Sequence, residues 1–229
     1  MDLQSKLQRV RARIASAAQT AGRDPADIRL VAVSKTHSAG AIRQAYAAGQ
    51  VDFAENRIQE AVPKIDSLRE LAMTWHFIGH LQRNKARLVP GHFQWLHTLD
   101  NLDLARRLSR AAVAMQTKLN CLIQVNVIQD AAKSGIAAGS LSRLMEEVVA
   151  ARLEGIRLRG LMTIGPRGGS ETDLRTCFAT LRSMQTDARS QFGMDEFDQL
   201  SMGMTADLEA AILEGATMVR IGSGIFGAR

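Results

Sequence analysis

The feature that most constrains the fold is a strict alternation of strand-like and helix-like segments along the chain. Eight runs rich in apolar and β-branched residues are each separated from the next by a segment with helical spacing. The predicted strands cover residues 29–35, 51–56, 74–79, 94–100, 120–127, 156–164, 197–203 and 216–223. The intervening helices are predicted over residues 41–49, 57–71, 82–89, 101–116, 140–152, 174–191 and 205–215, with a loop over 128–139. Strict alternation implies parallel strands joined by right-handed crossovers.

Eight such units in 229 residues fit a (β/α)8 barrel, or TIM barrel, better than an open doubly wound sheet. An open sheet would use about five or six strands, and no GxGxxG motif follows the first predicted strand. An amphipathic helix is predicted over residues 2–20, before that strand. Since no linker or shift in composition divides the chain, we expect a single α/β domain over residues 1–229.

The composition is that of a globular protein, with 46% hydrophobic and 23% charged residues. The net charge of +6 is spread along the chain and accompanies no nucleic-acid module, so we expect no nucleic-acid partner. Cys121 and Cys177 lack the spacing of a zinc site or a disulfide scaffold, and we expect no metal. Without a signal peptide or a long apolar run, the chain is expected to be a cytoplasmic monomer with no membrane partner.

In a barrel of this type the active site lies at the carboxyl ends of the strands. The residues at those positions are Lys35, Glu55, Asn56, Ile78, Gly79, Asp100, Asn126, Thr163, Ser201, Gly222 and Ser223. The loops after strands seven and eight often bind phosphate, and here they read LSMGMT and RIGSGIFG. Small residues allow close backbone approach, and the hydroxyls of Ser201 and Ser223 can donate to an anion. A tight structural turn is the alternative interpretation.

Lys35 ends a buried run, LVAVSK, at the same predicted mouth. A lysine amine condenses with aldehydes when it is neutral, and desolvation shifts it toward that form. An aldehyde that carries a phosphate describes pyridoxal 5'-phosphate (PLP). It also describes some sugar phosphates that Schiff-base aldolases cleave, so composition and spacing leave both ligands open.

Six blocks of the sequence resemble, in order, those of the pyridoxal phosphate homeostasis proteins. The blocks are LVAVSKTH, FAENRIQEAVPKI, WHFIGHLQRNKARLV, LIQVNV with KSGI, LRGLMTI and LSMGMTADLEAAILEGATMVRIGSGIFGAR. They extend from Leu30 to Arg229, and the long final block is the most specific of them. The resemblance implies a barrel of the alanine racemase N-terminal type, fold type III among PLP proteins.

The same resemblance implies that PLP is bound as an internal aldimine to Lys35. Arg220 would face the pyridine nitrogen, and Asn56 would lie near the ring. The phosphate would be held by the side chain of Ser201 and by the backbone of Gly222 and Ser223.

Several positions depart from the pattern of the family. The family commonly has Lys-Thr-Lys-Pro after the strand, whereas this chain has Lys-Thr-His-Ser, so His37 replaces a second lysine. Ala54 and Arg57 replace glycine and tyrosine, and His80 stands where proline is usual. If the second lysine of the family helps to pass PLP onward, this chain lacks that help. We therefore expect any change in PLP release to arise at His37.

The function expected from these features is intracellular PLP homeostasis, by a non-catalytic carrier or buffer with no catalytic residue. Arginine, being always cationic, would not keep the pyridine nitrogen protonated, and an unprotonated ring is a poorer electron sink. Alanine racemases add a second domain that supplies a catalytic tyrosine, and this chain is expected to lack that domain. The one tyrosine of this chain, Tyr46, is expected to be a packing residue.

The alternative is a racemase-like PLP enzyme with weak or partner-dependent activity. Candidate recipients of PLP are PLP-dependent enzymes in their apo forms.

A few other residues have both a functional and a structural interpretation. Lys133, in KSGI, is a candidate second PLP contact or an ordinary loop lysine. His76 and His97 are interpreted as buried, hydrogen-bonded histidines rather than metal ligands. Met202 and Met204 either line the ring pocket or fill gaps in the core.

Overall fold

The computed structural model describes residues 2–227, and in that range nine parallel strands form one sheet. Their order is β4-β3-β2-β1-β9-β8-β7-β5-β6, and an additional pairing between β4 and β5 closes eight of them into a barrel. The (β/α)8 prediction is therefore confirmed. Residues 1, 228 and 229 lie outside the described residues. The predicted domain, 1–229, includes all three of them, and the last motif block includes 228 and 229.

The strands agree closely with those predicted. They are β1 (Arg29–Val33), β2 (Asp52–Glu55), β3 (Thr74–Phe77), β4 (Trp95–Leu99), β5 (Leu119–Asn126), β6 (Ile136–Ala137), β7 (Ile156–Met162), β8 (Gln199–Ser201) and β9 (Met218–Ile221). The α-helices are α1 (Leu3–Thr20), α2 (Ala39–Ala47), α3 (Ile58–Asp66), α4 (Leu102–Ala114), α5 (Leu141–Ala150), α6 (Glu171–Phe192), α7 (Leu208–Leu213) and α8 (Ser223–Phe226). Three 3-10 helices are η1 (Pro25–Asp27), η2 (Arg83–Leu88) and η3 (Ala138–Ser140).

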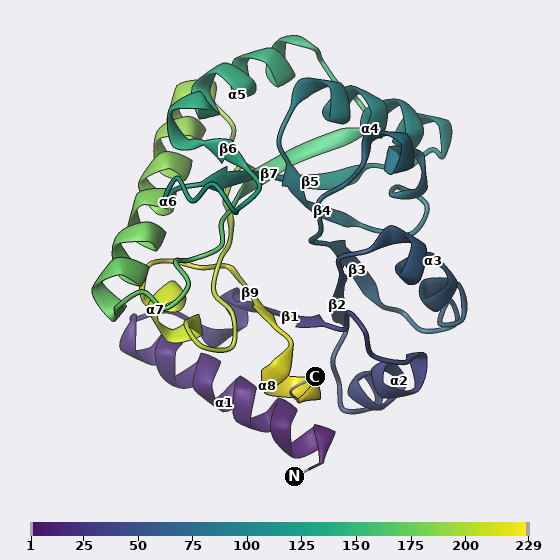
Figure 1. Cartoon of the computed structure of the whole chain (residues 1–229), viewed down its shortest axis with the longest axis vertical. Coiled ribbons are helices and arrows are strands. Elements are labelled where there is room, and N and C mark those ends of the chain that lie inside the picture. The colour runs from purple at the N-terminus through teal and green to yellow at the C-terminus, as the bar shows by residue number, and fades with distance from the viewer. Residues whose placement is uncertain (1, 228–229) are drawn as a thin grey trace.

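Alternate residues of each strand face two different buried regions. On β1, Ala32 packs in the larger apolar cluster, between the strands and the outer helices, while Val31 and Val33 pack in a smaller one. On β9, Val219 faces the larger cluster and Met218 the smaller one. We call the larger region the shell and the smaller one the interior of the barrel. Figure 1 shows the ring of strands with the helices around it.

Two segments differ from the prediction. Residues 128–139 were expected to be a loop, but Ile136 and Ala137 form the short strand β6, which pairs in parallel with Val125 and Asn126 of β5. Two residues give too short an alternation to be recognised in a sequence. Residues 82–89 were expected to be an α-helix, but η2 has the tighter 3-10 geometry.

The helix ends follow ordinary capping chemistry. Asp2 accepts a hydrogen bond from the amide of Ser5 and caps α1, which begins at Leu3, one residue after the predicted start. Helix α6 begins at Glu171, earlier than the predicted residue 174, because Ser170 and Asp173 form a reciprocal capping box.

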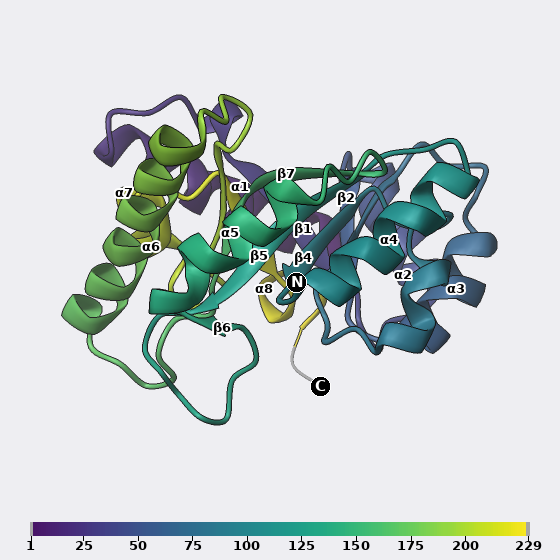
Figure 2. The same cartoon turned by 90° about the horizontal axis from the view of Figure 1, so that it is seen from above.

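All barrel strands are parallel, so their carboxyl ends meet at one end of the barrel, which we call the mouth. Figure 2 shows the loop that carries β6 and the helix α8 on this same side of the molecule. Among the described residues, no helix combines the length and the apolar character needed to cross a membrane.

Candidate functional site

The mouth of the barrel contains a cavity of about 590 Å³. Its described lining residues come from β1, β7, β9, α8 and the loops that follow β1, β2, β3, β7, β8 and β9. They are Val33, Lys35, His37, Asn56, Ile78, Gly79, Met162, Ile164, Met204, Thr205, Ala206, Arg220, Gly222, Ser223 and Gly227. The structure thus places five of the six predicted site residues on one cavity: Lys35, Asn56, Arg220, Gly222 and Ser223.

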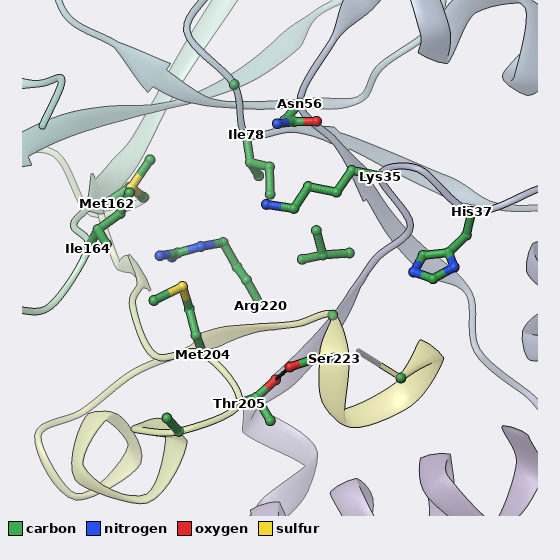
Figure 3. Close-up of a pocket in the computed structure, with 15 residues that line it drawn as sticks. Lys35, His37, Asn56, Ile78, Met162, Ile164, Met204, Thr205, Arg220 and Ser223 are labelled. Carbon is green, nitrogen blue, oxygen red and sulfur yellow. Dashed lines mark hydrogen bonds between the residues drawn. The ribbon is translucent and has the colours of Figure 1, made fainter. Parts of the chain in front are cut away.

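Lys35 lies two residues after the end of β1 and extends into the cavity (Figure 3). The next residue, Thr36, has φ +69°, the left-handed region that β-branched residues rarely adopt. Such backbone outliers persist where the surrounding structure over-determines them, and they cluster at functional sites. The turn at Thr36 redirects the chain immediately after the lysine.

A polar cup lies at the α8 end of the cavity. The hydroxyl of Ser223 donates to Thr205 Oγ1 at 3.2 Å, and the Gly224 amide lies 3.3 Å from the same oxygen. Figure 3 shows these two hydroxyls facing each other beside α8. A Cβ on Gly224 would come within 3.1 Å of the Thr205 methyl group, so glycine permits this close approach. We call Thr205, Ser223 and Gly224 the hydroxyl cup.

Arg220 lies on β9, next to β1, and its side chain also reaches the cavity. Its Nη1 donates to Ser201 Oγ at 2.7 Å, and its Nη2 donates to the carbonyl of Thr163 at 2.9 Å. Burial lowers the pKa of Arg220 to about 10, and nearby Asp207 opposes this effect. Arg220 therefore remains a cation at neutral pH, with its guanidinium fixed by two acceptors.

The structure places Ser201 differently from the sequence-based expectation. Ser201 is fully buried in the barrel interior, and its hydroxyl lies between Arg220 and Nδ1 of His97, which is 2.9 Å away. It does not line the described cavity. A serine at the carboxyl end of a strand could not be assigned to the mouth or the interior without the register of the strand.

Asn56 enters the cavity because the chain after β2 passes very close to the chain after β3. A Cβ on Gly79 would lie only 1.9 Å from the carbonyl oxygen of Asn56, so that position requires glycine. This contact fixes the backbone that carries the amide side chain.

The remaining walls are apolar. Ile78, Met162, Ile164 and Met204 line the cavity around the side chains of Lys35 and Arg220 (Figure 3). Met204 is 39% exposed and lines the cavity, as the first of its two interpretations predicted. Met202 is fully buried in the shell and fills space in the core, as the second predicted.

Two further residues singled out in the sequence have structural contacts at the mouth. His37 stacks on Phe226 of α8, with ring centroids 4.7 Å apart, and so joins the β1 loop to α8. The ammonium group of Lys133 donates to the carbonyls of Ile164 and Gly165, at 3.3 and 2.7 Å. These contacts support the interpretation of Lys133 as a loop lysine.

Sequence reasoning included Thr205 as the last residue of the candidate phosphate loop LSMGMT and as the first of the next predicted helix, but it did not single out Thr205 as a site residue. The available signal was a hydroxyl residue in the loop after strand seven, four positions beyond Ser201. The other missed lining residues are apolar, and single-sequence patterns do not distinguish them from core residues. Among residues 2–227, no cluster of three or more metal-binding side chains is present.

Comparisons with known proteins relate the chain to one family. The profile of the alanine racemase N-terminal domain matches residues 5–229. A pyridoxal phosphate homeostasis protein from Pseudomonas aeruginosa is 49% identical over 223 residues, which cover 97% of this chain and 94% of that protein.

Solved structures agree with this relationship. PipY from Synechococcus elongatus, with PLP bound, has a TM-score of 0.81 and 38% identity, and the match covers 93% of this chain and all of that one. An alanine racemase from Clostridium difficile has a TM-score of 0.74 at 16% identity, with 57% of its length covered, and this likeness concerns the fold alone.

Proposed function

This chain belongs to the family of pyridoxal phosphate homeostasis proteins, and we propose that it binds PLP through Lys35 and takes part in intracellular PLP homeostasis. The observation that carries the proposal is the meeting of an amine, a guanidinium and a hydroxyl cup at one cavity. PLP supplies an aldehyde that reacts reversibly with amines and a ring that withdraws electrons.

The dimensions and chemistry of the cavity fit this cofactor. Its volume of about 590 Å³ lies in the range of roughly 300–1,000 Å³ that is usual for small-molecule sites. In the hydroxyl cup, Ser223 and Gly224 both donate to Thr205 Oγ1, so the hydroxyl hydrogen of Thr205 is the one left to donate. We propose that Thr205 takes the role first expected of Ser201 in holding the phosphate, together with the backbone of Gly222 and Ser223. The apolar walls suit an aromatic ring, and Asn56, which also lines the cavity, would lie near that ring.

Arg220 is the partner that we propose for the ring nitrogen. A guanidinium group carries only donors, so it can donate to an unprotonated pyridine nitrogen but cannot accept a proton from it. A ring held in this way would be a weaker electron sink than one that faces a carboxylate.

We propose that the protein acts as a carrier or buffer rather than as an enzyme. Among the described lining residues, the ionisable side chains are Lys35, His37 and Arg220. Arg220 is held by two acceptors, and His37 stacks on α8, so neither is presented as a mobile acid or base opposite Lys35. Tyr46 lies on α2 and packs against the shell.

The open mouth leaves a path by which PLP reaches solvent. We propose that apo forms of PLP-dependent enzymes receive it there, and that His37 influences release, since it stands beside α8 at the rim. We propose a single cytoplasmic domain that works as a monomer.

A spectroscopic and mapping experiment tests the proposal. The purified protein is mixed with PLP, its visible absorption is recorded, and borohydride reduction is followed by peptide mapping. We expect the absorption of lysine-attached PLP and a pyridoxyl group on Lys35, both lost in Lys35→Ala. A pyridoxyl group on Lys133 instead would overturn the assignment.

Two further outcomes separate the alternatives. If no absorption appears and the protein cleaves a sugar phosphate in a Lys35-dependent reaction, the chain is an aldolase and the PLP proposal fails. If the PLP-loaded protein exchanges the α-hydrogen of L-amino acids for deuterium at enzymatic rates, and Lys35→Ala abolishes this exchange, the racemase-like alternative replaces the carrier.

A further inference from the structure

A row of hydrogen bonds crosses the barrel interior from its floor to the cavity. Asp52 Oδ1 lies 2.9 Å from Nε2 of His76, and Nδ1 of His76 lies 2.9 Å from Nε2 of His97. Nδ1 of His97 lies 2.9 Å from Ser201 Oγ, which accepts from Arg220 at 2.7 Å. The row therefore connects a carboxylate at the start of β2 with a guanidinium at the end of β9.

The surroundings of the row are dry. His76, His97 and Ser201 are completely buried, and Arg220 is 4% exposed. The ring of His76 stacks on Trp95, whose indole lies beneath the guanidinium groups of Arg29 and Arg159 at 5.4 and 5.8 Å. Trp95 and these two arginines lie at the floor end of the row, where the Asp52 side chain is 13% exposed.

The chemistry of the two ends fixes the direction of every proton between them. A carboxylate can only accept, so Nε2 of His76 carries a hydrogen and donates to Asp52. Burial lowers the pKa of His76 and lowers that of His97 well below its usual value, which keeps both rings neutral. A neutral imidazole has one donor and one acceptor, so Nδ1 of His76 must accept from Nε2 of His97.

The same rule continues to the other end. With its hydrogen on Nε2, His97 must accept at Nδ1, so the hydroxyl of Ser201 donates to it. Ser201 Oγ in turn accepts from Arg220, which carries donors only. All five groups are satisfied, and every hydrogen in the row points from Arg220 toward Asp52.

We propose that Asp52, His76, His97 and Ser201 form a one-way hydrogen-bonded chain whose role is to position Arg220 at the cofactor cavity. Ser201 is thus a positioning residue and not a phosphate ligand. A phosphate dianion needs donors, and the single hydroxyl hydrogen of Ser201 is committed to His97. Only the part that concerns PLP rests on the proposed function, because the direction of the chain is a property of the protein alone.

The first test uses the full chain without any ligand. Nitrogen-15 spectra of the imidazole rings identify which nitrogen carries the hydrogen, and His76→Gln and His97→Gln assign the signals. We expect both buried rings to be neutral at pH 7 with the hydrogen on Nε2. A hydrogen on Nδ1 of His97, or a doubly protonated ring, would overturn the one-way chain whether or not PLP binds.

The second test compares PLP with pyridoxal, which lacks the phosphate. Ser201→Ala removes one hydrogen bond to Arg220, so we expect the Kd to rise by about fivefold to tenfold for both ligands alike. Thr205→Ala is the matched contrast, and it should weaken PLP while leaving pyridoxal almost unchanged.

Ser201→Thr keeps the hydroxyl and should restore binding of both ligands, which separates the hydrogen bond from a general loss of packing. Thermal melting of each variant verifies that it is folded. If Ser201→Ala weakens PLP but not pyridoxal, the hydroxyl contacts the phosphate and the proposal fails. If neither ligand binds the wild-type protein, the proposed function fails, while the histidine spectra still decide the direction of the chain.

Discussion

The shell and the interior of the barrel are equally buried, but they contain different kinds of side chain. The shell is formed by apolar residues from both strands and helices, and it includes fully buried rings such as Phe53 and Phe178. The interior contains a much smaller apolar cluster and the hydrogen-bonded row that ends at Arg220. Burial alone therefore does not tell which region supports the fold and which supports the site.

The two regions also differ in how their charged side chains are paired. In the shell, Glu55 is fully buried and accepts from Lys64 and from Ser34, both at 2.7 Å, so its charge is neutralised locally. In the interior, neutral histidines separate Asp52 from Arg220, and Asp52 pairs instead with Arg29 at 3.4 Å. We infer that the shell supplies most of the stability, whereas the interior determines the geometry of the cavity and adds a pH-dependent part of the stability. Three predictions test this division.

The largest effect is expected from truncating the shell at Phe53. Phe53→Ala removes a fully buried ring and leaves a cavity, so the free energy of unfolding should fall by about 4 kcal/mol. Urea denaturation measures it, and Phe53→Leu, which fills most of the space, should lose much less. PLP affinity of the folded protein should change little; a large loss of affinity with a small loss of stability would contradict the division.

A somewhat smaller effect is expected from breaking the buried ion pair. Lys64→Met leaves the Glu55 carboxylate buried with Ser34 alone, because its other oxygen has no hydrogen-bond partner among residues 2–227. We expect a loss of about 3 kcal/mol by denaturation.

The double variant Glu55→Gln with Lys64→Met removes the charge as well as its partner, and it should recover most of that loss. If the double variant is as unstable as the sum of the two single ones, the two residues do not act as a pair.

The smallest effect, taken for one histidine over one pH unit, is a pH dependence that arises in the interior. Burial places the pKa of His76 and His97 below the ordinary 6.5, so below that pH the unfolded chain binds protons that the folded protein excludes. Their contribution to stability is complete above about pH 6.5, and each histidine loses up to about 1.4 kcal/mol per pH unit as the pH falls. Denaturation between about pH 5 and pH 7 measures this slope.

His97→Gln should flatten the slope, whereas His80→Gln, which removes an exposed histidine at the rim, should leave it unchanged. Equal slopes in the wild type and in His97→Gln would show that His97 is not held neutral by the fold.

The sequence was sufficient to predict the barrel and most of the polar residues of the cavity. The physical reasons for this also explain why Ser201 was placed wrongly. Strand alternation and the rule that parallel strands end at one mouth placed Lys35, Asn56 and Ser223 together, and the family resemblance added Arg220. The same rule could not separate Ser201 from Thr205, since one faces the interior and the other follows the strand into the loop. That distinction depends on strand register, which long-range pairing determines.

The hydrogen-bonded row was visible in the sequence only as separate polar residues. His76 and His97 were correctly interpreted as buried and hydrogen-bonded. Their order in space, from Asp52 to Arg220, arises because β2, β3, β4, β8 and β9 each contribute one inward side chain. No local pattern encodes a contact between residues on five strands.

The pairing of β1 with β9 also has a consequence for how the protein is made on the ribosome. A domain is synthesised from its N-terminal side, so Lys35 emerges early, while Arg220 and Ser223 emerge near the end of the barrel sequence. Until β9 is added, β1 has an unpaired edge and the lysine faces no guanidinium and no hydroxyl cup. The cofactor site is thus the last part of the barrel to be completed, and a nascent chain cannot take up PLP in this pocket before that moment.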